Sequence, residues 1–398
     1  MLRRATRFAL VPCGRAFTSP GMDFLLNPTP EHLALRESVA RFAKEEVAPQ
    51  AREADITMDF NHSLFRKLGD LGAFGVTIPA EDGGAGMDAT AAVIIHHELS
   101  KYDPGFCLAY LAHSMLFVNN FYHAANPDQR AKYLPKSLTG ETICGMGMSE
   151  PGAGTDVLGM ATTAELKGDY YVLNGSKLWI TNGPIGDVFL VYAKVNGRVT
   201  AFIVERAYEG FSSGKKIDKC GMRGSQMCEL HFDNVKVPKE NLLGEEGKGL
   251  VHMMRNLEIE RLALGAMAVG IADQCVEYMV QYAKDRKQFG KSILSFGQIQ
   301  RYIAESFAET EAAKTLTYAV SRAVDPNIAN RIGSDATKLF AAPVAKRVAD
   351  NAIQVMGGMG YSRDMPVERL WRDAKLLEIG GGTLEAHHKN LAKDLASL

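Results

Sequence analysis

The spacing of apolar residues predicts two helical regions separated by a region of strands. Between residues 28 and 126 the apolar positions recur at helical spacing, and Thr29 followed by Pro30 marks the start of the first helix. Between residues 142 and 237, β-branched and aromatic residues alternate with polar ones, which indicates strands. Helical spacing returns after Gly249 and continues to the end of the chain.

The strand region favours a small barrel or sandwich over a doubly wound sheet. Asn196-Gly197 lies between two apolar runs and is a strong hairpin signal. The sequence of this region offers no crossover helices of the kind that join parallel strands. We therefore expect an α+β chain with an N-terminal helical domain (21–143), a middle β domain (144–254) and a C-terminal helical domain (255–398).

Composition and charge narrow the function classes. The 398 residues are 46 % hydrophobic and 23 % charged, and their net charge of -1 gives no electrostatic footprint for nucleic acid. No apolar run approaches the roughly 18 residues of a membrane span. The six cysteines form no CxxC pair, and the histidines of the pairs His96-His97 and His387-His388 point apart on a helix. We expect reduced thiols and no metal site.

Residues 1–20 differ in composition from the rest of the chain. No acidic residue precedes Asp23, and the segment mixes apolar residues with Thr6, Thr18 and Ser19. It also carries four arginines, at positions 3, 4, 7 and 15. This composition predicts a mitochondrial transit peptide and hence a protein of the mitochondrial matrix, the alternative being a disordered tail without a targeting role.

Two carboxylates interrupt an apolar helical run at residues 257–265. Glu258 and Glu260 lie about 200° apart around a helix, so only one of them can face inward. Glu260 shares its face with Leu264 and Met267, at spacings typical of a buried stripe. Burial without a partner raises a carboxyl pKa and suits a general base, whereas a structural pairing with Arg or Lys is the plainer interpretation.

Two segments of the β region have unusual chemistry for connecting loops. Residues 148–156 offer small side chains, hydroxyls and backbone amides to a ligand that approaches closely. Residues 177–183 place the Trp179 indole, which can stack on a flat ring, beside the Thr181 hydroxyl. Each segment alone could be an ordinary turn or contain a core tryptophan, but together they favour a site for a heteroaromatic ligand.

The chain resembles the acyl-CoA dehydrogenase family over nearly its whole length. The motifs that carry the resemblance are Met148–Asp156, Trp179–Gly183, Cys220–Ser225, Tyr282–Lys291, Gln354–Tyr361 and Leu370–Lys375. The family implies FAD as cofactor and a C-terminal domain built as a four-helix bundle. It also implies oxidation of an acyl-CoA to its trans-2-enoyl form, with electrons leaving to electron-transferring flavoprotein.

The resemblance also implies where the base lies. Most relatives carry it in a Tyr-Glu-Gly-Thr motif, which here reads Gly380-Gly381-Gly382-Thr383. The branches that act on isovaleryl-CoA and on long-chain acyl-CoA carry it on the earlier helix, at the position of Glu260. Gly380 replaces a bulky tyrosine and leaves room for a methyl branch. Segments around His113 and Lys132 also resemble the isovaleryl-CoA branch, so we expect conversion of isovaleryl-CoA to 3-methylcrotonyl-CoA in leucine breakdown.

Further roles follow from the same resemblance. The residues expected to hold FAD within one subunit are Met146, Met148, Ser149, Thr155, Trp179, Ile180 and Thr181. Those expected to reach the FAD of a neighbouring subunit are Arg286, Gln354, Gly357 and Gly358, with Thr383 and Glu385 closing the site. The residues expected to contact substrate are Thr155, Glu258, Arg261, Leu264, Gly380, Gly381 and Gly382. Glu260 would remove the α-proton while a backbone amide near Gly381 and a ribityl hydroxyl of FAD polarise the thioester carbonyl. A shared cofactor implies a homo-oligomer, in this family usually a tetramer.

The chain departs from the family pattern at two places, and three other functions are alternatives to the one that the resemblance implies. Gly297 follows Phe296 where relatives have glutamine, and residues 384–389 lack the arginines common in relatives, so some FAD contacts differ. The alternatives are a long-chain acyl-CoA dehydrogenase, an assembly or binding flavoprotein with little turnover, and an oxidase that passes electrons to oxygen.

Overall fold

The computed structural model describes residues 23–325 and 331–397, so the predicted transit peptide lies outside the described residues. The first part of the chain is helical, as its apolar spacing predicts. Its α-helices are α1 (Asp23–Leu26), α2 (Pro30–Phe42), α3 (Ala51–Thr57), α4 (His62–Asp70), α5 (Ala89–Ser100), α6 (Pro104–Leu111), α7 (Asn120–Ala124) and α8 (Pro127–Leu138). Two π-helical segments, η1 (Ala43–Val47) and η4 (Ala112–Asn119), continue α2 and α6. Thr29 caps α2 and Pro30 occupies its first turn, so the predicted helix start is confirmed.

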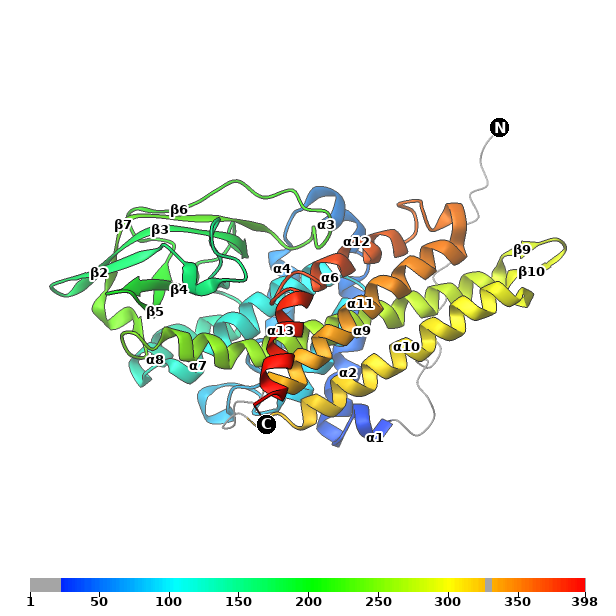
Figure 1. Cartoon of the computed structure of the whole chain (residues 1–398), viewed down its shortest axis with the longest axis horizontal. Helices are drawn as coiled ribbons and strands as arrows, with labels where there is room; N and C mark the ends of the chain where they lie inside the picture. The colour runs from blue at the N-terminus through cyan, green and yellow to red at the C-terminus, as the bar shows by residue number, and fades with distance from the viewer. Residues whose placement is uncertain (1–22, 326–330, 398) are drawn as a thin grey trace.

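The middle of the chain forms an eight-stranded sheet folded around its own apolar core. Its strands are β1 (Cys144–Gly147), β2 (Thr163–Lys167), β3 (Tyr170–Thr181), β4 (Val188–Val195), β5 (Arg198–Glu205), β6 (Phe211–Ser213), β7 (Met227–Pro238) and β8 (Leu242–Leu243). The order is β6-β7-β3-β2-β4-β5-β8, with β1 paired to β4. Figure 1 shows β6, β7 and β3 in one layer over β4 and β5, and apolar side chains from β3, β4, β5 and β7 fill the interior. This is the predicted sandwich.

The last part of the chain is a helical bundle. Its helices are α9 (Gly249–Asp285), α10 (Gly297–Arg322), α11 (Arg331–Met356), α12 (Val367–Leu377) and α13 (Leu384–Leu395). Helices α9 to α12 pack on one another as the expected four-helix bundle, and α13 lies against α11. A two-stranded hairpin, β9 (Lys287–Gln288) and β10 (Lys291–Ser292), projects from the end of the bundle farthest from the sheet (Figure 1).

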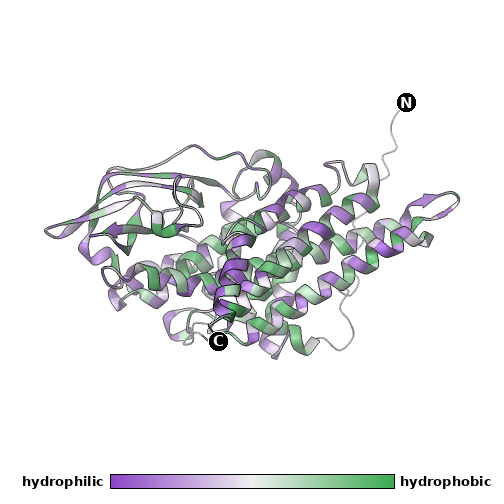
Figure 2. Cartoon of the chain, viewed as in Figure 1, coloured by the Kyte–Doolittle hydropathy of each residue, from purple (hydrophilic) through white to green (hydrophobic). Residues whose placement is uncertain are grey.

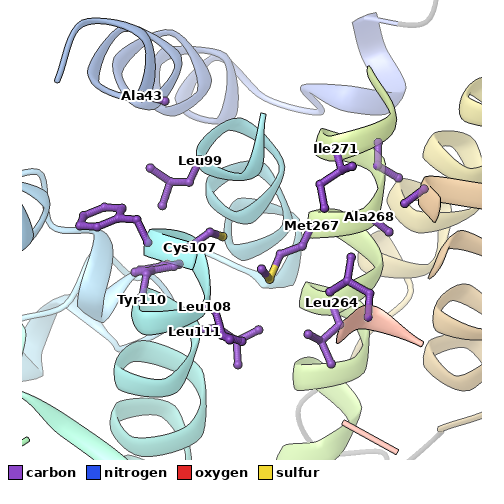
Figure 3. Packing of buried hydrophobic residues seen from close by; sticks show 14 of the residues in the cluster. Ala43, Leu99, Cys107, Leu108, Tyr110, Leu111, Leu264, Met267, Ala268 and Ile271 are labelled. Atoms are coloured by element: carbon purple, nitrogen blue, oxygen red, sulfur yellow. The ribbon is translucent and has the colours of Figure 1, made fainter. Parts of the chain in front are cut away.

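One apolar core joins the two helical regions. Leu264, Met267 and Ile271 of α9 face Leu108 and Leu111 of the first region (Figure 3), and the same cluster continues into α11 and α12. Figure 2 shows hydrophobic and hydrophilic residues alternating along these helices, as expected for helices with one buried side. The sheet has an apolar core of its own, and a further cluster packs one side of the sheet against helical residues, among them Phe117, Phe121 and Leu257.

Helix α9 is the longest and one of the most apolar helices described. Among the described residues it is the one helix that contains an 18-residue window apolar enough to cross a membrane by length and composition. That window is 78 % buried inside the protein, so its apolar side chains already have partners. The described cysteines are free thiols, and the described part of the chain contains no cluster of three metal-ligating side chains.

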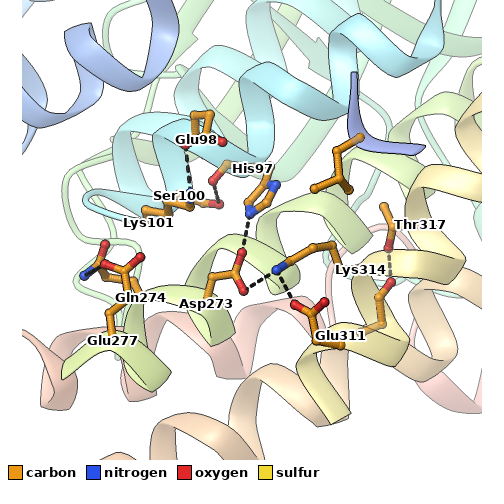
Figure 4. Close-up of polar contacts among 12 residues, drawn as sticks. His97, Glu98, Ser100, Lys101, Asp273, Gln274, Glu277, Glu311, Lys314 and Thr317 are labelled. Atoms are coloured by element: carbon orange, nitrogen blue, oxygen red, sulfur yellow. Dashed lines mark hydrogen bonds and ion pairs between the residues drawn. The ribbon is translucent and has the colours of Figure 1, made fainter. Parts of the chain in front are cut away.

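Charged side chains are buried where α5, α9 and α10 meet (Figure 4). Asp273 of α9 accepts from His97 at 2.8 Å and pairs with Lys314 at 2.8 Å. Lys314 also pairs with Glu311 at 2.6 Å. Each of these charges has a partner of opposite sign, which is the condition for burying them. The network ties the N-terminal helices to the C-terminal bundle.

A hairpin and an irregular strand in the sheet can be compared with the predictions from the sequence. The Asn196-Gly197 hairpin is confirmed, with both residues at positive φ between β4 and β5. Residues 177–181, expected in a loop, belong instead to β3, where the pairing with β7 shifts between Lys177 and Ile180. Trp179 occupies this irregularity with φ of 65°. The left-handed residue interrupts the alternation that would have marked a strand.

Candidate functional site

Glu260 lies inside the protein, on the face of α9 that the sequence predicts. Glu260 is only 6 % exposed, and Leu264 and Met267 on the same face are also buried. Glu258, by contrast, is half-buried. Glu260 Oε2 has no hydrogen-bond partner. Burial raises the pKa of Glu260 to about 7, against the opposing charges of Arg261 and Lys338. A carboxyl group with this pKa can exchange a proton with a substrate near neutral pH.

The glycine turn at residues 380–382 lies directly opposite Glu260. Gly381 has φ of 66°, and a Cβ placed on it would lie 3.4 Å from Glu260 Oε1 and 2.3 Å from Leu264 Cδ1. The predicted base Glu260 and the predicted substrate residues Leu264 and Gly381 are therefore neighbours. Gly380 differs, because a Cβ there would meet nothing nearer than 3.6 Å. The turn thus packs closely against Glu260 and Leu264, with no room for a Cβ at Gly381.

A polar cluster behind the turn was not found from the sequence. Arg261 Nη1 pairs with Asp335 Oδ1 at 2.7 Å, so this arginine does not neutralise Glu260 by direct pairing. His387 contacts Asp335 through Nδ1 at 3.0 Å and the Gly382 carbonyl oxygen through Nε2 at 3.2 Å. Lys338 Nζ donates to the same carbonyl oxygen at 2.5 Å. Asp335 and Lys338 are charged residues within an apolar helical run, three positions apart. The same pattern drew attention to Glu260 in the sequence.

The segment after β1 is anchored by a buried ion pair. Lys177 Nζ donates to Glu150 Oε1 at 2.7 Å and to the Met148 carbonyl at 3.2 Å, and Lys177 is fully buried. Glu150 also accepts from the backbone amides of Ala161 and Thr162. These bonds fix the loop that contains Ser149 and Thr155 against β3. Sequence reasoning assigned the loop to a ligand but missed the pair that holds it.

The two predicted flavin segments present the groups that a flat heteroaromatic ring requires. The Trp179 indole is 56 % exposed beside half-buried Thr181, while Ile180 is buried beneath them. Asn182 Nδ2 secures the segment by donating to the Ala109 and Cys144 carbonyls at 3.0 Å each. Gly152 and Gly154 are open to any approaching group, because a Cβ on either would meet no atom within 4 Å. An exposed indole and a hydroxyl suit the isoalloxazine ring of FAD, and an open glycine loop suits its phosphates.

Four other predicted FAD residues lie elsewhere in this chain. Arg286 follows α9, and its distance from Glu260 along the helix axis is about 40 Å at 1.5 Å per residue. Gln354, Gly357 and Gly358 are exposed at the end of α11, which runs beside α9. The end of α9 that leads to Arg286 lies away from the sheet that carries Trp179 (Figure 1). Thr383 caps α13, next to Glu385, and both adjoin the glycine turn.

The chain thus combines helical, sheet and helical parts with a buried carboxylate on α9 and an exposed indole at the sheet. Three family models match in order: the N-terminal domain of acyl-CoA dehydrogenase over residues 29–141, its middle domain over 145–235 and its C-terminal domain over 247–396. The chain belongs to the acyl-CoA dehydrogenase family, whose cofactor is FAD.

Relatives and solved structures agree on this fold and differ in substrate. The mitochondrial isovaleryl-CoA dehydrogenase of Oryza sativa subsp. japonica is 40 % identical over 96 % of this chain and 94 % of that protein. Butyryl-CoA dehydrogenase from Megasphaera elsdenii superposes with a TM-score of 0.90 at 36 % identity, covering 92 % of this chain and 98 % of that one. An acyl-CoA dehydrogenase from Bacillus anthracis complexed with FAD gives a TM-score of 0.87 at 32 % identity, covering 93 % and 67 %.

Proposed function

We propose that the protein oxidises a short branched-chain acyl-CoA, isovaleryl-CoA, to 3-methylcrotonyl-CoA. The observation that carries the proposal is the pairing of a buried carboxylate on α9, Glu260, with a glycine turn that bears no carboxylate of its own. An acyl-CoA dehydrogenase needs one base at the α-carbon, and Glu260 is the carboxylate that adjoins this turn. The isovaleryl-CoA dehydrogenase from rice among its relatives supports the choice of substrate.

In the proposed reaction the chain positions and deprotonates the substrate. Glu260 takes the proton from the α-carbon, and its unpartnered Oε2 leaves it free to do so. The backbone amide of Gly381 donates to the thioester oxygen, where negative charge develops as the proton leaves. Leu264 and the neighbouring apolar side chains exclude water from the carboxylate. Bound FAD supplies the acceptor for the hydride that leaves the β-carbon.

The substrate preference is proposed to rest on Gly380. A side chain at this position would project beside the reacting carbons, and the backbone leaves space for one because the nearest atoms lie 3.6 Å from a Cβ. In its absence the acyl group can carry a methyl branch there. Gly380→Ala should therefore slow oxidation of isovaleryl-CoA more than oxidation of butyryl-CoA, which is unbranched.

The proposal extends to assembly, partner and location. The separation of about 40 Å along α9 between Glu260 and Arg286 supports an FAD shared between protomers, as in a homotetramer. Electron-transferring flavoprotein is the proposed electron acceptor. The arginine-rich, acid-free first twenty residues support import into the mitochondrial matrix.

The test is anaerobic reduction of the bound flavin by isovaleryl-CoA, butyryl-CoA or palmitoyl-CoA. Reduction is monitored as the loss of the visible absorbance of the flavin. The expected result is rapid bleaching by isovaleryl-CoA and none in the Glu260→Gln variant, which keeps its flavin. Bleaching mainly by palmitoyl-CoA would assign the protein to long-chain substrates. A flavin that no thioester reduces would indicate a binding flavoprotein, and peroxide formed in air without the flavoprotein acceptor would indicate an oxidase.

A further inference from the structure

A buried lysine lies beside the proposed base and touches the glycine turn. Lys338, on the second turn of α11, is 0 % exposed and donates from Nζ to the Gly382 carbonyl oxygen at 2.5 Å. A Cβ on Gly381 would lie 3.7 Å from Lys338 Cε and 3.4 Å from Glu260 Oε1. Both side chains therefore come within 4 Å of the same point, one from α11 and the other from α9.

The partner of Lys338 distinguishes it from other buried lysines of the chain. Lys177 pairs with Glu150 at 2.7 Å and Lys314 pairs with Asp273 at 2.8 Å, so a carboxylate in direct contact offsets each of those charges. Lys338 instead donates to a carbonyl oxygen. A buried ammonium is costly, and one that is not offset by direct contact acts strongly on the charges around it.

We infer that Lys338 is a positioning residue for the dehydrogenation, which holds the glycine turn against Glu260 and supplies a positive charge beside the base. The inference rests on the proposed function of Glu260. As the α-proton moves to Glu260, negative charge leaves that carboxylate and develops on the thioester oxygen near the turn. A fixed ammonium beside both groups stabilises the negative charge before and after the transfer. The bond to Gly382 keeps the turn in place throughout.

The charged groups around Lys338 set its protonation. Burial lowers the pKa of Lys338 to about 8; Glu260, Asp335 and Glu378 oppose this shift, and Arg261 adds to it. His387 of α13 contributes a further contact to the same carbonyl oxygen. Because burial raises the pKa of Glu260 and lowers that of Lys338, the pH range in which the base is ionised and the lysine protonated together is narrow. Flavin reduction should follow a bell-shaped pH dependence.

The experiment measures the anaerobic rate of flavin reduction in the FAD-loaded enzyme from about pH 6 to about pH 9, a range that spans both ionisations. Lys338→Met should slow reduction by about tenfold or more, as expected when a reacting group is misplaced. It should also remove the alkaline limb and move the acid limb to higher pH, because Glu260 loses a neighbouring positive charge. Lys338→Arg should recover part of the rate without an alkaline limb, since arginine stays charged.

Lys314→Met is the matched control, because it removes a buried lysine of the same helical core from a place remote from the turn. It should lower the melting temperature and leave both limbs unchanged. A Lys338→Met enzyme whose rate falls equally at every pH, with both limbs in place, would overturn the inference. If that variant does not fold or hold FAD, an alkaline limb that persists in Lys338→Arg would overturn it as well. A wild-type flavin that no acyl-CoA reduces would instead refute the proposed function.

Discussion

Gly381→Ala tests whether the turn is fitted to the side chains of α9. The new methyl group would lie 2.3 Å from Leu264 Cδ1, which is far shorter than a van der Waals contact. The backbone at Gly381 also has a positive φ of 66°. The left-handed conformation costs a residue with a Cβ about 1–2 kcal/mol. Forcing a methyl group into a packed core costs a further amount of about 1–3 kcal/mol. The free energy of unfolding should fall by about 2–5 kcal/mol.

The assay is denaturant unfolding of the FAD-loaded protein, with two further variants. Gly380→Ala, where the nearest atoms lie at 3.6 Å, should change the free energy of unfolding by less than about 0.5 kcal/mol. Combining Gly381→Ala with Leu264→Ala removes the clashing atom, so the loss in the double variant should be smaller than the two separate losses together. Losses that add within about 0.5 kcal/mol would refute the reasoning, because they would mean that the two side chains do not interact.

Three other expectations follow from the structure. Because burial raises the pKa of Glu260 to about 7, the folded protein keeps a proton that the unfolded chain loses near its ordinary value of 4.5, so stability falls as pH rises between these values. Glu260→Gln should therefore raise the melting temperature at about pH 8 and have little effect at about pH 4; an equal change at both would contradict this. Lys177→Met leaves Glu150 buried without its cation and should cost about 3–5 kcal/mol and weaken FAD binding, with part of the loss recovered on adding Glu150→Gln. Phe289 is 92 % exposed at the tip of the β9–β10 hairpin, and we expect it at a subunit contact. Phe289→Asp should therefore lower the mass of the oligomer measured by light scattering and the amount of bound FAD. An unchanged mass would argue against that contact.

The sequence predicts what depends on local periodicity. The order of helical, strand and helical regions and the inward direction of Glu260 follow from spacing alone, because the pattern repeats over many residues. The interpretation of residues 177–181 as a loop was wrong, because Trp179 in a left-handed conformation breaks the alternation of β3. Helix α9 contains a stretch of membrane-spanning length and composition, but its apolar side chains are covered by the rest of the protein.

The parts of the candidate site that escaped prediction depend on contacts between distant segments. Lys338 and the Gly382 carbonyl that it meets are 44 residues apart, and Arg261 meets Asp335 from another helix. No local pattern gives such a pairing, although charged residues on an apolar helix mark the positions where a partner is required. The predicted division of FAD contacts between two protomers rests on the family resemblance alone.

The core shared by the two helical regions has a consequence for how the chain folds during synthesis. His97 and Asp273, which meet in the buried network, are 176 residues apart in sequence. At about 5–20 residues per second, the N-terminal helices emerge from the ribosome roughly 9–35 s before their partners on α9. For that period the apolar sides of α5 and α6 are exposed to water while the sheet can already pair its own strands. The sides of α5 and α6 that pack on α9 can therefore be covered only after the middle β domain has been made.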